Sequence, residues 1–505
     1  MELASITYRP FLAVLCPAIG AFLILVSGRR PNIREAWTMV ASVLCFSSVI
    51  SMVPNVLNEG PIDCTLFHIF KGIDFAYRVD AFGLIFAITS SFLWIIVSLY
   101  SIGYMRALEE HAQTRYYFFF ALAIFGAIGV ALSKNLVTMF IHYEILTVST
   151  YPLVAHDESP KALSAGRKYL AYLLTSGCFL LAATLITYWL TRTTDFEPNG
   201  ILTLASASRL TLQILFVCFM LGFMKAAWMP FHSWLPTAMI APTPVSALLH
   251  AVAVVKTGVF GIIRTVCYIY GIDLMHALGL GIFLACLASF TVIVANLYAI
   301  GEDNLKRRLA YSTISQLSFI ILGVALLSPM GVTGGMIHIT FHAFMKITLF
   351  LCAGAIIVIT GKRNVSELAG IGRIMPITMM AFTLTAAGMC GIPPIAGFIS
   401  KWYICLGSIQ AGEIAFLFVA LTASLLDVVY LFPIIRTAFF ERPAISVLAN
   451  GGEKVVKETG RPIYLFMIIP LAITAIFSIV FFFFPRTFYI LDLVEMAVRT
   501  LSGGM

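Results

Sequence analysis

Residues 225–256, KAAWMPFHSWLPTAMIAPTPVSALLHAVAVVK, decide how this chain folds. Two lysines bracket the stretch, four prolines interrupt it, and both of its flanks are strongly apolar. A proline inside a helix removes a backbone hydrogen bond and kinks the chain. In a bilayer such a break survives only where protein or a water-lined cavity satisfies the freed backbone groups. The stretch therefore predicts a broken membrane helix with two buried ammonium groups.

The composition places the whole chain in a membrane. Hydrophobic residues make up 60% of its 505 residues and charged residues only 11%, against about 25% charged residues in soluble domains. The net charge of +8 is explained by basic loops, so no nucleic-acid partner is expected. The ten cysteines lack C-x-x-C spacing, and no phosphate-binding or nucleophile motif is present. We expect an all-α polytopic membrane protein in a lipid bilayer, with no cofactor and no metal.

The apolar runs and the basic loops predict the topology. Of the 32 Lys and Arg residues, nineteen fall in one set of alternate loops, eight on the opposite side and five inside the spans. The positive-inside rule then places both termini on the outer face of the cell inner (plasma) membrane. About fourteen runs are long enough to cross ~30 Å of hydrocarbon, near 10–27, 36–54, 80–104, 115–132, 135–155, 166–190, 209–228, 242–270, 275–299, 309–327, 332–359, 374–410, 413–440 and 462–485.

A second proline-broken stretch suggests an internal repeat. GIPPIAGFIS, at 391–400, precedes Lys401 in span 12, five spans after the break in span 7. When a repeat contains an odd number of membrane helices, the next repeat has the inverted orientation in the membrane. Interrupted helices at corresponding positions of two such repeats are typical of transport sites. We expect two inverted five-helix repeats, spans 4–8 and 9–13, with broken helices 7 and 12. The predicted divisions are 1–110 (spans 1–3), 111–272 (first repeat), 273–440 (second repeat) and 441–505 (cytoplasmic loop, span 14 and C-terminal tail).

Seven charged side chains fall inside these spans, and each would cost about 2.5–3.5 kcal/mol in the middle of a bilayer. Glu144 lies about ten residues from either end of its run, which favours a functional role. Lys225 is also compatible with an interfacial lysine that closes a span. Arg264 lies towards the outer end of its span and is expected to snorkel to water. The seven are Glu144, Lys225, Lys256, Arg264, Lys346, Lys401 and Asp427.

Span 11 carries a polar stripe. His338, His342 and Lys346 are spaced i, i+4 and i+8, which places them on one helix face. Imidazole titrates near neutral pH, and both of its nitrogens can carry a proton. One histidine alone could be a hydrogen-bonding core residue, but two with a lysine on one face predict a proton relay.

Five motifs connect the chain with a known family: HYEILTVSTYPLV, the opening stretch with its continuation TGVFGIIR, LKRRLAYSTISQLSFI, HITFHAFMKITLFLCAG and GIPPIAGFISKW. From about residue 75 to 440 the chain resembles the antiporter-like proton-translocating subunits of respiratory complex I, membrane-bound hydrogenases and Mrp-type cation/proton antiporters. Lys401 departs from the complex I member that has glutamate there, and the chain is not expected to carry the long lateral helix extension of the most distal complex I member. It is most similar to the D-type subunit of Mrp antiporters and its counterparts in hydrogenase-type complexes.

The resemblance implies roles for residues of the first repeat. Glu144 matches the family's glutamate in span 5, and Lys225 matches its lysine partner in span 7. Lys256 matches the relay lysine of span 8, with His250 beside it. His232 is a secondary polar candidate. If Glu144 and Lys225 form an ion pair, the carboxylate keeps the lysine protonated. When the ion pair separates, Lys225 is expected to release its proton towards Lys256.

The second repeat supplies the rest of the relay that the resemblance implies. His338, His342 and Lys346 match the central residues of span 11, and Lys401 matches the terminal lysine of span 12. Asp427 in span 13 is a secondary polar candidate with no decided role.

The expected function is that of a proton-translocating membrane subunit in a multisubunit redox-driven ion pump or an Mrp-type cation/proton antiporter. Its expected partners are other membrane subunits and protons, with sodium as a further candidate ion. The chain is expected to hold no redox centre of its own but to belong to an oxidoreductase complex of the NADH dehydrogenase or hydrogenase type. The alternatives are a self-sufficient sodium/proton antiporter, a membrane enzyme handling a quinone or lipid, and a structural scaffold.

Overall fold

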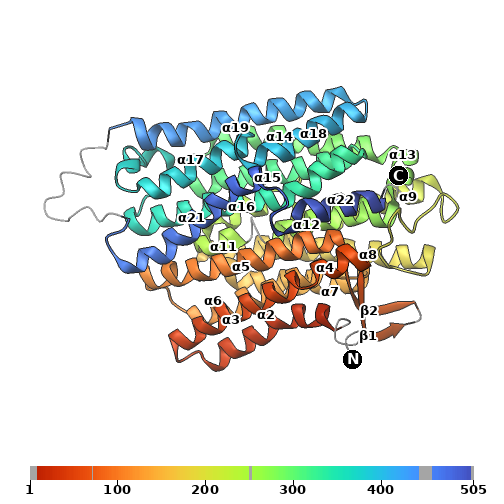
Figure 1. The fold of residues 1–505 in the computed structure, drawn as a ribbon, viewed down its shortest axis with the longest axis horizontal. Helices are drawn as coiled ribbons and strands as arrows, with labels where there is room; N and C mark the ends of the chain where they lie inside the picture. Colours follow the sequence, from red (N-terminus) through yellow and green to blue (C-terminus); the bar gives the residue numbers. More distant parts are fainter. Residues whose placement is uncertain (1–7, 71, 249–252, 443–457, 502–505) are drawn as a thin grey trace.

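The computed structural model describes residues 8–70, 72–248, 253–442 and 458–501. These residues form a bundle of helices that lie side by side, with one β-hairpin at its edge (Figure 1). The N-terminal part contains α2 (Arg9–Val26), α3 (Pro31–Ile50), α4 (Val53–Glu59), β1 (Ile62–Phe70), β2 (Ile73–Val79) and α5 (Ala81–Ala107).

Two further groups of helices follow. The middle of the chain forms α6 (Gln113–Ala131), α7 (Leu136–Val154), α8 (Pro160–Thr191), α9 (Arg209–Gly222), η1 (Met224–Ala226), α10 (Trp234–Thr237), η2 (Ala238–Ile240), α11 (Thr243–Ala247), α12 (Val254–Arg264), η4 (Thr265–Tyr270) and α13 (Ile272–Leu278). The last part forms α14 (Leu280–Gly301), α15 (Leu305–Ala325), α16 (Pro329–Thr360), η5 (Val365–Glu367), η6 (Ile371–Arg373), α17 (Pro376–Cys390), α18 (Ala396–Gln410), α19 (Ile414–Phe440), α21 (Pro462–Phe483), η7 (Thr487–Tyr489) and α22 (Ile490–Leu501).

Many of these helices can cross a membrane. Among the described residues, ten helices are individually long and apolar enough to do so. An eleventh span is obtained if α12 with η4 is joined to α13, across a bend of 88°. The protein is therefore a multi-pass helical membrane protein, as the composition predicted. The three remaining predicted spans, 135–155, 209–228 and 374–410, correspond to helices that are shorter or more polar, namely α7, α9 and the broken pair α17 and α18.

Both proline-rich stretches interrupt helices where the sequence predicted it. The helix α9 ends at Gly222, and the chain then continues in short turns until α11 begins at Thr243. The helix α17 ends at Cys390, where Gly391 has a φ of 83°, and α18 begins at Ala396. Proline cannot donate the hydrogen bond that a continuous helix needs at these positions.

The β-hairpin was not predicted from the sequence. The strands β1 and β2 pair antiparallel, with Ile62 opposite Val79 and Cys64 opposite Tyr77. Ile62 and Cys64 are buried, whereas Asp63 between them is exposed. This alternation has a period of two, which a search for apolar runs about twenty residues long does not detect.

The helix α16 lies near the centre of the bundle (Figure 1). It packs against α5, α15, α17, α18 and α21, and nearly all of its side chains from Gly331 to Ile356 are buried. The helix α2 begins and α22 ends on the same side of the bundle.

Candidate functional site

The polar stripe of α16 lies wholly inside the protein. His338, His342 and Lys346 are each 0% exposed. The two imidazole rings stack, with their centroids 5.6 Å apart. The stripe faces α15 and α18 rather than lipid, because those helices carry its hydrogen-bond partners.

Hydrogen bonds lead from the stripe to Lys401. Nε2 of His338 lies 3.2 Å from Oε1 of Gln316 on α15, and the Gln316 amide nitrogen donates to Oδ2 of Asp427 over 2.8 Å. Nζ of Lys401 donates to the same carboxylate oxygen over 2.7 Å. A second contact joins Nδ1 of His338 to Oγ of Ser400 over 2.7 Å. These groups satisfy one another in an interior where unpaired polar atoms are costly.

Lys346 reaches the same carboxylate by a branch. Its Nζ donates to Oγ of Ser312 over 2.8 Å and to the carbonyl of Leu309 over 3.3 Å. The hydroxyl of Tyr430 lies 2.7 Å from Oγ of Ser312 and 2.8 Å from Oδ1 of Asp427. Asp427 is therefore contacted by Lys401 directly and by Lys346 through two hydroxyl groups.

Lys256 connects the stripe with the first half of the chain. Its Nζ lies 2.7 Å from Nδ1 of His342, although the two residues are 86 positions apart in the sequence. Lys256 is 1% exposed and belongs to α12, the helix that follows the broken stretch. A lysine of the first predicted repeat thus contacts a histidine of the second.

Glu144 and Lys225 do not contact each other in this structure. Lys225 is fully buried in η1, where its ammonium group donates to the carbonyl of Tyr143 and lies 3.2 Å from the centroid of the Tyr143 ring. Oε1 of Glu144 is buried and has no hydrogen-bond partner among the described residues. The Glu144 carboxylate instead packs closely against Gly177 of α8. The pair that the resemblance implies is open here.

Close backbone packing brings Lys225 near α12. A Cβ atom added to Gly258 would lie 2.2 Å from the amide nitrogen of Ala226 and 2.7 Å from the carbonyl carbon of Lys225. Glycine at 258 therefore allows α12 to touch the turn that carries Lys225. Among the described residues, no side-chain hydrogen bond joins Lys225 to Lys256.

Arg264 differs from its prediction. The sequence led us to expect a snorkelling side chain, but Arg264 is 1% exposed and forms a bidentate ion pair with Asp80. The rings of Phe82, Phe260 and Tyr268 surround the guanidinium group. Asp80 at the start of α5 supplies a counter-charge inside the protein, so the arginine has no need to reach water.

One secondary candidate, His232, lies apart from the polar chain. The polar chain is the connected set Lys256, His342, His338, Gln316, Asp427, Lys401, Ser312, Tyr430 and Lys346. His232 is half-buried beside the rings of Tyr298 and Tyr311. His250 lies outside the described residues.

Sequence reasoning missed the neutral members of the polar chain. Ser312 and Gln316 are spaced i, i+4 on α15 inside LKRRLAYSTISQLSFI, the same spacing that singled out the α16 stripe. Tyr430 follows Asp427 by three residues on α19. A search for polar residues at helical spacing, whether charged or not, would have found all three.

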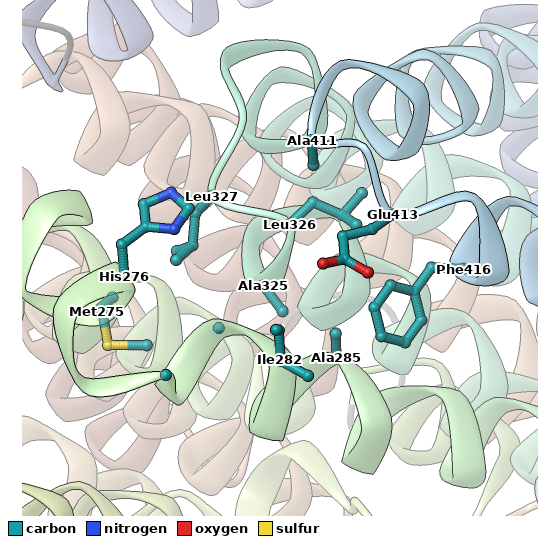
Figure 2. A pocket seen from close by; sticks show the side chains of 12 residues that line it. Met275, His276, Ile282, Ala285, Ala325, Leu326, Leu327, Ala411, Glu413 and Phe416 are labelled. Carbon is teal, nitrogen blue, oxygen red and sulfur yellow. The ribbon is translucent and has the colours of Figure 1, made fainter.

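The pocket shown in Figure 2 is separate from the polar chain. It encloses about 180 Å³ between α13, α14 and the start of α19. His276 and Glu413 lie on its walls among apolar side chains such as Ile282 and Leu327. None of its lining residues belongs to the polar chain.

Comparisons with known proteins agree with this architecture. The family described as "NADH:quinone oxidoreductase/Mrp antiporter, TM" matches residues 133–427. The N-type subunit of the NADH-quinone oxidoreductase of Desulforudis audaxviator is 31% identical over 373 residues, which cover 73% of each chain.

Two longer relatives also match. The antiporter protein mnhA2 of Staphylococcus aureus is 27% identical and aligns with 98% of this chain, which spans 63% of that protein. A K(+)/H(+) antiporter protein of Rhizobium meliloti, of the combined A/B type, is 29% identical over 85% of this chain, which spans 43% of it. This chain thus covers less than two thirds of both relatives.

Two solved structures share the fold. One chain from the Mrp complex of Dietzia sp. DQ12-45-1b superposes with a TM-score of 0.86 at 21% identity, covering 98% of this chain and 97% of that one. A chain of the membrane-bound sulfane sulfur reductase, an archaeal respiratory membrane complex, gives 0.84 at 24% identity and covers 98% of each. On the family match over residues 133–427 and the relation to the N-type subunit, this chain belongs to the NADH:quinone oxidoreductase/Mrp antiporter transmembrane family.

Proposed function

We propose that this chain is a proton-translocating subunit of a multisubunit membrane complex, either a redox-driven ion pump or an Mrp-type cation/proton antiporter. The observation that carries the proposal is the buried polar chain from Lys256 to Lys401. It passes through the Lys256–His342 contact, the stacked histidines, and the Gln316–Asp427 link. Amines, imidazoles and a carboxylate at hydrogen-bond distance can exchange protons inside a bilayer.

The relatives support the same proposal. Their names describe a subunit of an NADH-quinone oxidoreductase and subunits of antiporters. The two solved structures are multisubunit membrane complexes. The predicted similarity to the D-type Mrp subunit stays a prediction, because the relatives named above are of the N and A types.

The two acid–lysine arrangements suggest how transport proceeds. Lys401 and Asp427 are in contact, whereas Glu144 and Lys225 are apart. Closing the Glu144–Lys225 pair would hold a proton on Lys225, and opening it would release that proton towards Lys256. Water in the break between Met229 and Pro242 would bridge the two lysines, since broken membrane helices are accommodated by hydrated cavities. The driving energy arrives from partner subunits or from an opposing ion gradient.

The proposal includes the number of membrane spans, their grouping into repeats and their orientation in the membrane. Fourteen spans would comprise three N-terminal ones (1–110), two inverted five-helix repeats (111–272 and 273–440) and a last span within 441–505. Both termini would face the outside of the plasma membrane, which places the basic loops in the cytoplasm. Two helix breaks five spans apart and chain ends on one side of the bundle support this arrangement.

The test uses inverted membrane vesicles that contain the complete complex. Proton uptake is followed with a pH-sensitive dye for the native chain and for Lys256→Ala, with Lys362→Ala in an interhelical loop as the matched control. We expect Lys256→Ala to lose roughly nine-tenths of the uptake at normal assembly, and Lys362→Ala to retain it. Equal uptake by native chain and Lys256→Ala would exclude the proposed route. Uptake by the purified chain alone would instead indicate a self-sufficient antiporter.

A further inference from the structure

A cluster of possible metal ligands lies outside the polar chain, on the side of the bundle that carries the basic loops. Glu110 and His111 belong to the loop between α5 and α6, and His156 belongs to the loop between α7 and α8. One ligand atom from each residue lies within 4.8 Å of the others. The sequence predicted no metal, because that expectation relied on cysteine spacing, whereas this cluster joins residues 45 positions apart.

His156 is buried without a hydrogen-bond partner. Its side chain is 1% exposed, and neither ring nitrogen has a hydrogen-bond partner among the described residues. Nε2 of His156 is 3.9 Å from Oε2 of Glu110, which is too far for a hydrogen bond. Nδ1 of His111 is also 3.9 Å from that oxygen, and the rings of His111 and His156 lie side by side with their centroids 4.8 Å apart. A buried imidazole that lacks partners is costly unless a further group, such as a metal ion, binds it.

We propose that Glu110, His111 and His156 form a binding site for a divalent transition-metal ion of the zinc class. Two imidazoles and one carboxylate are a common three-ligand set for zinc. Ligands about 2.0–2.1 Å from a zinc ion at tetrahedral angles are ~3.4 Å apart. The two separations of 3.9 Å from the Glu110 oxygen therefore have to close by about half an ångström, and the separation between the two imidazole ligand atoms, at most 4.8 Å, by up to about 1.4 Å. His111 is 47% exposed and can make this adjustment.

The surroundings leave a fourth coordination position open. Glu110 and His156 line a cavity of about 1080 Å³ that extends to Tyr104, Thr243 and Lys306. Water from this cavity can supply the remaining ligand. Asp157 also lines the cavity and adds negative charge close to the cluster.

Several basic side chains line the same cavity, and two of them or their neighbours, Arg115 and Lys306, are engaged by other groups. The guanidinium group of Arg115 forms an ion pair with Glu158 and donates to the carbonyl of His156, so it is occupied away from the imidazole nitrogens. Lys306, which lines the same cavity, donates to the carbonyl of Ala241. The bound ion would link the α5–α6 loop to the α7–α8 loop beside the cavity.

The experiment measures zinc binding by the purified full-length chain. The chain is produced without a histidine tag and is stripped of metal before the measurement. Isothermal titration with zinc chloride and metal analysis after gel filtration give the affinity and stoichiometry. We expect one zinc ion per chain, and binding weakened by at least about tenfold in Glu110→Gln, His111→Ala and His156→Gln. Zinc should also raise the melting temperature of the native chain, reversibly with EDTA.

The control is His276→Gln, which removes an exposed histidine that shares its pocket with Glu413 but with no second histidine among the described residues that line it. It should bind zinc as the native chain does. His111→Ala keeps the test decisive if His156→Gln fails to fold, because His111 is about half exposed, whereas His156 is buried. Absence of zinc binding, or binding unchanged in His111→Ala, would overturn the site. Neither result depends on proton transport, so this proposal can fail while the proposed function stands.

Discussion

Nζ of Lys401 lies 2.7 Å from Oδ2 of Asp427, inside the protein and 26 positions away in sequence. Lys401 also donates to the carbonyl of Met389, the next-to-last residue of α17, just before the break. The lysine therefore links the broken helix α17–α18 to α19. This ion pair is closed, whereas the Glu144–Lys225 pair of the first half is open.

Asp427→Ala should destabilise the protein and abolish transport. It leaves the Lys401 ammonium group buried without its counter-charge, and breaking a buried pair in this way costs about 3–5 kcal/mol. Thermal denaturation in detergent and proton uptake in vesicles measure the two effects.

Glu441→Gln is the control, because Glu441 pairs loosely with exposed Arg436 and such a pair contributes at most about 1 kcal/mol. The double variant Lys401→Met/Asp427→Leu should recover stability without transport. Normal uptake by Asp427→Ala would contradict the role of the pair.

Glu144→Gln and Lys225→Ala should each abolish proton pumping while assembly survives. Each removes one member of the pair whose closing and opening we propose to control proton release. Uptake is compared at matched protein levels, with subunit association checked by co-purification. Near-normal pumping by both variants would show that the pair is not an essential switch.

Gly177→Ala should impair transport although it changes no polar group. The added Cβ atom would lie 2.2 Å from Oε1 of Glu144, so the carboxylate has to move from its present position. We expect uptake to fall by severalfold with little change in assembly. Gly301→Ala is the matched control, because a Cβ atom there has no neighbour within 4 Å. If both variants transport equally, the position of the Glu144 carboxylate does not matter for the rate.

Lys346→Ala should block transport more completely than His338→Ala or His342→Ala. Water can replace one imidazole in a polar chain, but it cannot replace the charge that Lys346 brings to Ser312 and Tyr430. Proton uptake of the three variants, normalised to protein, gives the order. Greater loss in either histidine variant than in Lys346→Ala would reverse this assignment.

The proposed orientation predicts which loops face outwards. In a background that lacks the exposed cysteines Cys178 and Cys286, a membrane-impermeant maleimide should label Thr203→Cys on intact cells. It should label Lys161→Cys only after the membrane is permeabilised. Both positions are exposed in the structure, so labelling reports sidedness rather than burial. The opposite pattern would place the termini in the cytoplasm.

The sequence by itself determined the class of protein, the position of both helix breaks and the charged residues at its centre. Apolar runs and prolines act locally, through hydrocarbon length and a missing backbone donor, so they can be recognised in a single chain. The spacing of His338, His342 and Lys346 likewise follows from the geometry of one helix.

Only the tertiary structure decided which charges meet. Asp427 on α19 accepts a hydrogen bond from Lys401 on α18, and Asp80 forms an ion pair with Arg264. The Gln316 side chain links His338 of α16 to the Asp427 carboxylate of α19. Such pairs depend on how helices distant in sequence pack together, and no local pattern records that packing. The open Glu144–Lys225 arrangement and the His156 cluster were hidden for the same reason. Desolvation makes each buried polar group need a partner, but the fold selects the partner.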